Sequence, residues 1–282
     1  MVKTLKFVLR ELLCDKFTDL PHCRRSGYQV AIETFRYRMA SIGIPLTRNE
    51  RRLLRYRDLH LGQRAFIIGN GPSLKNTDLS LLRKDVTFGV NSIFLNDQHF
   101  LPTYYVLEDY LVAEDRAKQI QAIKGPVKFW GNYLKYCMDN AEDVIWCNVR
   151  VRYDDYPDFP RFSTDAVREL WVGGTVSYLC MQLAYFMGIS TVYLIGFDHS
   201  YVIPKDVSVV DGNIISNSSD PNHFSGDYFG KGYRWHDPQV DRMEVAYRKA
   251  KLYFEHDGRR IYNATVGGKL ELFERVDYRS LF

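Results

Sequence analysis

The 282-residue sequence predicts an α/β fold: a doubly wound, mostly parallel Rossmann-like sheet with a helical N-terminal extension and a lid. Three observations predict this architecture. From Arg64 onwards, short apolar runs of strand length alternate with helical segments. The first run leads directly into a glycine turn, and a polar stretch at residues 200–237 interrupts the alternation. The alternation is typical of a parallel sheet, and an interruption of this length is typical of a lid.

The strands and helices are expected in a regular order. Strands are predicted at residues 65–69, 86–90, 103–107, 127–130 and 144–147, with a helix at 110–123 between the third and fourth strands. A strongly apolar helix at 176–187 ends at Gly188 and precedes a strand at 191–196. A final helix from Pro238 to about His256 leads into a last strand at 260–263.

Two segments differ from the alternating part. Residues 1–60 are predicted to form a basic, helical N-terminal extension, and residues 61–282 a nucleotide-binding α/β domain. We expect the extension to pack on that domain, with an arm that docks on a membrane surface or a partner as the alternative. Residues 200–237 are rich in Gly, Ser, Asn, Asp and Tyr and are predicted to be a long loop that serves as the lid.

Composition narrows the class of protein. The net charge of +4 suits an anionic ligand or the edge of an anionic membrane, and it is too small to predict a nucleic-acid partner. Five widely spaced cysteines without a CxxC pair argue against a disulfide framework and a structural zinc site. No metal site is therefore expected. The oligomeric state stays open.

The expected location is the cytoplasm. No run of about 18 apolar residues is present, and the apolar N-terminal run contains charges and no signal-peptide core. Peripheral contact with the inner face of the membrane, through the N-terminal region, is the membrane association that the sequence suggests.

The strongest local signal is the segment Gly69-Asn70-Gly71-Pro72-Ser73-Leu74, directly after the first strand. In an open α/β sheet, ligands bind beyond the carboxyl ends of the strands, and the first strand–helix turn often binds phosphate. Glycine lets backbone N–H groups approach an oxyanion, proline suits a first helical turn, and Ser73 can cap that turn. The segment is neither a Walker loop nor a dinucleotide fingerprint. It predicts a nucleotide site, with a plain glycine turn as the alternative.

Other polar residues follow the predicted strands at the same edge of the sheet. They are Asn91, Glu108, Asp109, Asp198 and His199. Each alone suits a turn or a helix cap, but the carboxyl ends of parallel strands meet at one edge. We therefore expect them in one crevice beside the glycine segment, where an asparagine amide can recognise a ribose or a base.

The start of the apolar helix is a second candidate anion site. Gly174 and Thr175 open this helix, and their donors could hold a phosphate or carboxylate. Simple capping of the helix by Thr175 is the alternative.

Histidines supply the candidate acid or base. His223 and His236 both lie in the predicted lid, and His236 stands directly before the final helix. A histidine at a helix start tends to stay neutral and can accept a proton, so His236 is the predicted base. A substitution of His223 is the control for a substitution of His236. Arg234 could face an anionic ligand. Helix capping by His236 is the alternative.

Several of these motifs together resemble known proteins. Gly69-Asn-Gly-Pro-Ser-Leu-Lys, Val90-Asn91, Gly174-Thr175-Val-Ser and Val192-Tyr-Leu-Ile-Gly-Phe-Asp198 resemble bacterial lipooligosaccharide sialyltransferases, which have an α/β nucleotide-binding domain with a lid and use a CMP-sialic acid donor. His236-Asp-Pro, the helix and the tail from Gly258 to Leu270 resemble more closely the wider group of 6-hydroxymethylpterin diphosphokinase-like proteins. That group also includes motility-associated flagellin glycosyltransferases. The resemblance covers about residues 62–282.

The sialyltransferase resemblance implies roles for individual residues. Asn70 and Asn91 would contact the cytidine or ribose, and Gly71, Ser73 and Thr175 would hold the phosphate or carboxylate. His236 would be the general base of an inverting transfer. The implied nucleotide site is completed by Gly69, Pro72, Gly174 and Asp198.

The lid departs from the sialyltransferase pattern. Those enzymes place one of two leaving-group tyrosines directly after a Gly-x-Asp-x motif, where this chain has Ser200 followed by Tyr201. Further lid candidates are Tyr228, Tyr233 and Arg234.

The first functional interpretation is therefore a glycosyltransferase. It would move a CMP-activated acidic sugar (sialic acid, or a related nonulosonate or Kdo-type sugar) to a glycan acceptor in surface-glycan biosynthesis, without an obligatory cofactor. One alternative is a diphosphokinase that moves pyrophosphate from ATP to a pterin alcohol, with Mg²⁺ held by Glu108, Asp109 or Asp198. The other is a nucleotide-binding module without catalysis, which would be indifferent to His236.

Overall fold

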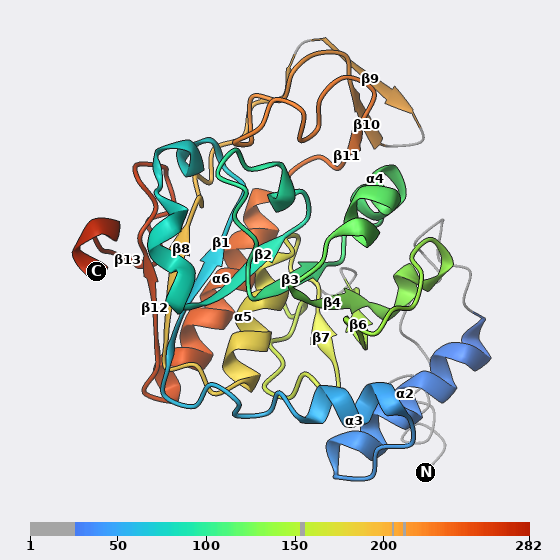
Figure 1. Cartoon of the computed structure of the whole chain (residues 1–282). Coiled ribbons are helices and arrows are strands. Elements are labelled where there is room, and N and C mark those ends of the chain that lie inside the picture. Colours follow the sequence, from blue (N-terminus) through green and yellow to red (C-terminus); the bar gives the residue numbers. More distant parts are fainter. Residues whose placement is uncertain (1–25, 153–155, 205, 211–212) are drawn as a thin grey trace.

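The computed structural model describes residues 26–152, 156–204, 206–210 and 213–282 (Figure 1). Its centre is an eight-stranded sheet in which every pair of neighbouring strands is parallel, in the order β13-β12-β8-β1-β2-β3-β4-β5. The predicted α/β class with a mostly parallel sheet is confirmed. The strands are β1 Arg64–Ile68, β2 Val86–Val90, β3 Tyr104–Leu107, β4 Val127–Gly131, β5 Val144–Cys147, β8 Thr191–Ile195, β12 Arg260–Asn263 and β13 Glu274–Arg275.

The strand order reverses at β1. From there the chain moves outwards through β2, β3, β4 and β5, and it returns to place β8, β12 and β13 on the other side. Because crossovers between parallel strands are right-handed, the two directions put their connections on opposite faces of the sheet. The carboxyl ends of β1 and β8 therefore flank a topological switch point, where ligands bind in open α/β sheets.

The helices follow the predicted positions closely. The α-helices are α2 Gly27–Ser41, α3 Arg48–Leu54, α4 Tyr110–Ala122, α5 Ser177–Phe186 and α6 Val240–His256. Short 3₁₀ helices are η2 Pro72–Asn76, η3 Leu79–Lys84, η4 Ile93–Leu95, η5 Asn132–Tyr136 and η6 Tyr278–Leu281. All but one of the ten residues of α5 are buried, as expected for a helix that is apolar on every side. None of the described helices has both the length and the apolar character needed to cross a bilayer.

The N-terminal helices cover one edge of the sheet. The Asn49 side chain donates to the Trp146 carbonyl (2.8 Å) and accepts from the Trp146 amide (2.9 Å), so it pairs with the edge strand β5 as a neighbouring strand would. Tyr37 is buried and donates to the same carbonyl (2.7 Å). The expected packing of the extension on the main domain is confirmed for α2 and α3. The part of the predicted helical extension before Ser26 lies outside the described residues.

The predicted lid is not one long loop. It contains a three-stranded antiparallel sheet, in the order β11-β10-β9, which lies over the carboxyl edge of the main sheet (Figure 1). Its strands are β9 Val207–Val210, β10 Asn213–Ser216 and β11 Arg234–Trp235. A second small sheet pairs β6 Val149–Arg150 with β7 Leu170–Trp171. The prediction of a loop was wrong here because Gly, Ser and Asn dominate the composition, although short apolar runs are present.

Candidate functional site

The glycine segment lies at the switch point between β1 and β8. Gly69 N donates to Ile195 O (2.7 Å), and Gly71 N donates to Gly196 O (3.0 Å). A Cβ atom at Gly69 would lie 2.6 Å from Gly196 O. These glycines are therefore required because the ends of two neighbouring strands pack against each other, backbone to backbone.

This packing bears on the prediction that the backbone amides of the glycine segment bind a phosphate. Ser73 N lies 3.2 Å from both carboxylate oxygens of Asp198, and Ser73 Oγ donates to Asp198 Oδ2 (2.7 Å). The amides of Gly69, Gly71 and Ser73 thus bond to the end of β8 and its following loop, so these three donors are used within the protein and do not point at a bound phosphate. Ser73 is also not the cap: η2 is a five-residue 3₁₀ helix with Pro72 near its start and Gly71 at its N-cap.

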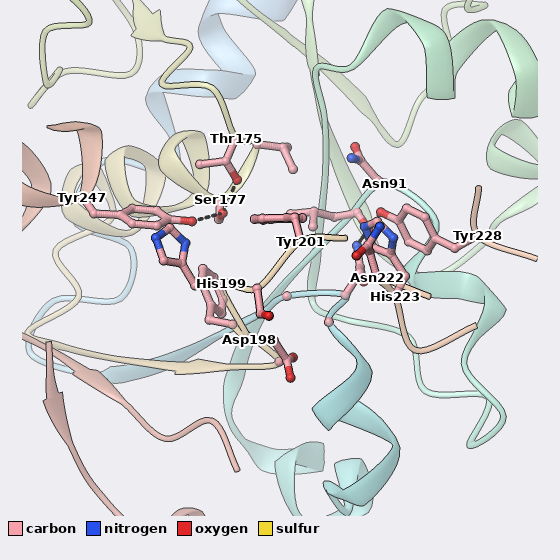
Figure 2. Close-up of a pocket in the computed structure, with 18 residues that line it drawn as sticks. Asn91, Thr175, Ser177, Asp198, His199, Tyr201, Asn222, His223, Tyr228 and Tyr247 are labelled. Carbon is pink, nitrogen blue, oxygen red and sulfur yellow. Dashed lines mark hydrogen bonds between the residues drawn. The ribbon is translucent and has the colours of Figure 1, made fainter. Parts of the chain in front are cut away.

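A crevice of two joined compartments opens beside this segment, and Figure 2 shows the residues that line the smaller one. The smaller, of about 110 Å³, is lined by Gly69, Asn70, Gly71, Asp198, His199 and others. The larger, of about 530 Å³, has a volume usual for small-molecule sites and is lined by Glu108, Asp109, Gly174, His236, Arg242 and others. Both are lined by Asn91, Thr175, Val176, Tyr201, Asn222, His223 and Tyr228. A ligand that fills both compartments therefore has its middle against these shared residues.

The lid is docked on the glycine segment through Asn70. Phe224 N donates to Asn70 O (2.9 Å), and Asn70 Nδ2 donates to Val90 O (2.9 Å) and to the Tyr228 hydroxyl (2.7 Å). The amide donors of Asn70 are thereby used within the protein. Only its oxygen remains for a ligand.

Two amide oxygens in the crevice are buried without a hydrogen-bond partner among the described residues: Asn70 Oδ1 and Asn91 Oδ1. Asn91 has a φ of 46°, a left-handed conformation that asparagine tolerates better than most residues. A buried acceptor without a donor costs about 1–3 kcal/mol, which a ligand amino or hydroxyl group would relieve. The smaller compartment therefore suits a ligand rich in donors.

The N-terminus of α5 contributes hydroxyl groups to the crevice. Thr175 Oγ1 and Ser177 Oγ are 2.6 Å apart, and Ser177 Oγ lies 3.3 Å from the buried Tyr247 hydroxyl (Figure 2). The N-cap residue is Val176, and no side chain caps the helix, so capping by Thr175 is excluded. Gly174 has a φ of 77°, which lets the chain turn into the helix. The positive end of the helix and two hydroxyls together suit an anion.

His236 lies in the larger compartment with a carboxylate beside it. Its Nε2 is 3.7 Å from Asp109 Oδ1, its side chain is 44% exposed, and the Tyr110 ring lies 5.1 Å away. It precedes α6 by four residues and so does not stand at the helix start, because the helix begins at Val240. Burial raises the pKa of Asp109, while the charge of His236 opposes that rise. The pair can accept a proton on the imidazole and stabilise the charge that results.

Glu108 lies next to this pair. Burial and the neighbouring Asp109 raise the pKa of Glu108 to about 8, although Tyr133 donates a hydrogen bond (2.9 Å) to its carboxylate. Near neutral pH this carboxyl group is therefore mostly protonated. Asp109 also caps α4 by accepting from Leu111 N (2.9 Å).

The four lid residues predicted to contact the leaving group or the ligand differ in whether they line the crevice. Tyr201 and Tyr228 line both compartments, whereas Tyr233 and Arg234 line neither. Arg234 bonds to Asp115 and Glu114 on α4, which corrects its expected role beside an anionic ligand. The guanidinium carbon of Arg116 lies 4.0 Å from the centre of the Tyr233 ring. Among the residues that line the crevice and that sequence reasoning missed are Ser177, Asn222, Arg242 and Tyr247.

The three candidate magnesium ligands do not line the same compartment of the crevice. Glu108 and Asp109 line the larger compartment, while Asp198 lines the smaller one and is held by Ser73. Within the part of the chain that the structure describes, no three His, Cys, Asp or Glu side chains are grouped as a metal centre.

Comparison with protein-family models gives no match to this chain, and no curated protein matches its sequence. A functional assignment therefore depends on the geometry of the crevice.

Proposed function

We propose that this chain is a glycosyltransferase that takes a CMP-activated acidic sugar as donor and acts in surface-glycan assembly. One observation carries the proposal. At the switch point of the sheet, a polar compartment with unpaired amide oxygens joins a larger compartment that contains a histidine–carboxylate pair. The first suits the nucleoside part of a donor, and the second suits the sugar and the attacking acceptor.

The nucleoside end matches the smaller compartment chemically. Cytosine has an amino group and ribose has hydroxyl groups, and these donors would satisfy Asn70 Oδ1 and Asn91 Oδ1. The phosphate would lie at the N-terminus of α5, against the hydroxyls of Thr175 and Ser177, because the amides of the glycine segment are already bonded.

The larger compartment matches the acidic sugar. Arg242 lines it close to Gly174, and a guanidinium is well suited to bind a sugar carboxylate. His236 would take the proton of the acceptor hydroxyl while the hydroxyl oxygen attacks the anomeric carbon opposite to CMP. The bond from that carbon to the phosphate oxygen breaks, and CMP leaves. Asp109 would stabilise the imidazolium that forms.

The two alternatives differ from this proposal in their requirements. A diphosphokinase would bind ATP with Mg²⁺, yet Asp198 is engaged by Ser73 and lies in the other compartment from Glu108 and Asp109. A non-catalytic nucleotide-binding module would give no reason for a histidine–carboxylate pair in the larger compartment.

The decisive variant is His236→Ala. Release of CMP from CMP-sialic acid, measured with and without added acceptor, should fall by about a hundredfold to ten-thousandfold, the usual contribution of a positioned base. The affinity for CMP should change little, because the base acts on the acceptor. His256→Ala, at the exposed end of α6, is the matched control. Near-normal turnover by the His236 variant would refute the assigned role.

We further propose that α2 and α3 contact an anionic lipid surface. Residues 26–63 contain seven arginines and three acidic residues. Tyr28, Ile32 and Phe35 are spaced along one face of α2, and all three are exposed, Tyr28 by 74%. Exposed apolar side chains next to arginines suit the headgroup region of a membrane. In Figure 1 these helices lie at the end of the molecule opposite the lid, so a bound membrane would leave the crevice open.

A further inference from the structure

His223 is held more firmly than His236. Its Nδ1 lies 2.7 Å from Asp220 Oδ2, which is within hydrogen-bond distance, and the Asp220 side chain is almost fully buried. The carboxylate of Asp220 is itself fixed, because it accepts from the amides of Asn222 (2.7 Å) and Phe229 (3.0 Å). Since a carboxylate only accepts, Nδ1 carries the hydrogen. Nε2 is therefore the nitrogen that remains for a ligand.

Aromatic contacts fix the plane of this imidazole. The Tyr228 ring is parallel to it, with an angle of 1° between the planes and 3.9 Å between the ring centres. The Phe229 ring meets it edge-on at 5.2 Å. Tyr228 is in turn bonded to Asn70 of the glycine segment. The histidine is therefore placed relative to the main sheet, although it belongs to the lid.

The position of His223 determines which part of a donor it can meet. It lines both compartments, as do Thr175 and Asn222, and Figure 2 shows it among the pocket residues with Tyr228, on which it stacks. In a nucleotide sugar, the phosphate joins the nucleoside to the sugar. A donor that fills both compartments places that phosphate against these shared residues.

The phosphate needs positive charge there. Among the described residues, no lysine lines either compartment, and Arg242 is the one arginine, in the larger compartment. CMP leaves as a phosphate monoester, which has more negative charge than the diester it comes from. The His223 ring, held through Nδ1 by the buried Asp220 carboxylate, is the group at the boundary of the compartments that can bring a proton to that charge.

We propose, on the basis of the function proposed above, that His223 is a second catalytic residue and acts on the leaving phosphate. As the bond between the anomeric carbon and the phosphate oxygen breaks, its electron pair stays on that oxygen, and Nε2–H of His223 gives the oxygen a proton. His236 meanwhile takes the proton of the acceptor hydroxyl. The protein gives one proton and takes one, and exchange with water restores both histidines. Asp220 is a positioning residue that keeps Nε2 directed at the phosphate.

The test uses the full chain with three variants, His223→Gln, His223→Ala and Asp220→Asn, and His256→Gln as the matched control. Binding of CMP to the wild type, monitored by NMR of the histidine rings, should shift the His223 signals and leave those of His256 in place. Turnover of CMP-sialic acid by His223→Gln should fall by about a hundredfold or more, with a much smaller change in CMP affinity. Added imidazole should restore part of the activity of His223→Ala. Asp220→Asn should lose less activity than His223→Gln and change the pH dependence of turnover.

Each outcome separates the two proposals. If CMP stabilises the wild type but leaves the His223 signals unmoved, the role of His223 is wrong and the proposed function stands. The same holds if His223→Gln turns over within about threefold of the wild type, or if its loss is entirely one of affinity. If CMP does not bind the wild type at all, the proposed function fails, and the role of His223 fails with it.

Discussion

Gly71→Ala is the substitution whose outcome the structure predicts most sharply. A Cβ atom at this position would lie 2.7 Å from Gly196 O and closer still to the Asp198 carboxylate. The carboxylate can move away only by breaking its bonds to the amide and hydroxyl of Ser73. The Gly196 carbonyl cannot move without displacing the end of β8.

The expected cost follows from these contacts. Forcing a methyl group into a packed site costs about 1–3 kcal/mol, and a lost hydrogen bond to a charged group about 1.5–3 kcal/mol. Gly71→Ala should therefore lower the free energy of unfolding by about 2.5–6 kcal/mol, a large part of the stability of a typical protein. The double variant Gly71→Ala/Asp198→Ala should recover only part of this loss, because the contact with Gly196 remains.

Urea unfolding at equilibrium measures this directly. Gly27→Ala is the control, since nothing lies within 4 Å of a Cβ atom there, and its effect should stay within about 0.5 kcal/mol. If Gly71→Ala were as stable as the wild type and lost only nucleotide binding, the glycine would serve the ligand and not the packing of β1 against β8. That result would refute the reasoning.

Three further outcomes are expected. Tyr228→Phe leaves an Asn70 amide hydrogen without its acceptor, so it should cost about 1–3 kcal/mol and increase proteolysis of the lid; an unchanged lid would contradict the docking. The pKa of Glu108 is raised to about 8, so between about pH 5 and 8 the folded protein keeps a proton that the unfolded chain has lost. Stability should therefore fall as the pH rises, by up to about 1.4 kcal/mol per pH unit, and Glu108→Gln should flatten that slope in urea unfolding. Ile32→Ser/Phe35→Ser should reduce sedimentation with anionic vesicles and leave the affinity for CMP unchanged; equal sedimentation would exclude this face of α2.

Much of the fold could be predicted from the sequence because its strands are short, apolar and buried on both faces. All four residues of β3 are buried, and such runs separated by helices have few alternatives to a parallel sheet. The small sheet of the lid could not be predicted in this way, since Val207–Val210 is largely exposed and forms a strand by pairing with Asn213–Ser216.

The position of the crevice could also be predicted, but the hydrogen bonds that its residues make within the protein could not. Parallel topology brings Asn91, Asp109 and Asp198 to one edge, as the positions after their strands indicate. A sequence does not show which donors are already used, however. Asp198 takes the amide of Ser73, and Tyr228 takes that of Asn70, so two predicted ligand contacts are internal bonds.

His223 shows the same limit for a catalytic group. The spacing of Asp220 and His223, three residues apart, was a usable signal, but the stacking of Tyr228 on the imidazole appears only in three dimensions. The structure therefore makes His223 unsuitable as a neutral comparison for His236, the use that the sequence suggested.

The central claim is that the crevice at the switch point binds a cytidine nucleotide. Thermal unfolding should be measured with CMP, CDP, ATP and GTP, each with and without Mg²⁺, on the wild type and on Thr175→Val. CMP alone should stabilise the wild type, by about 2.7 kcal/mol at a hundredfold excess over its dissociation constant, and Thr175→Val should reduce this gain. Stabilisation by ATP with Mg²⁺ and none by CMP would contradict the central claim and favour pyrophosphoryl transfer.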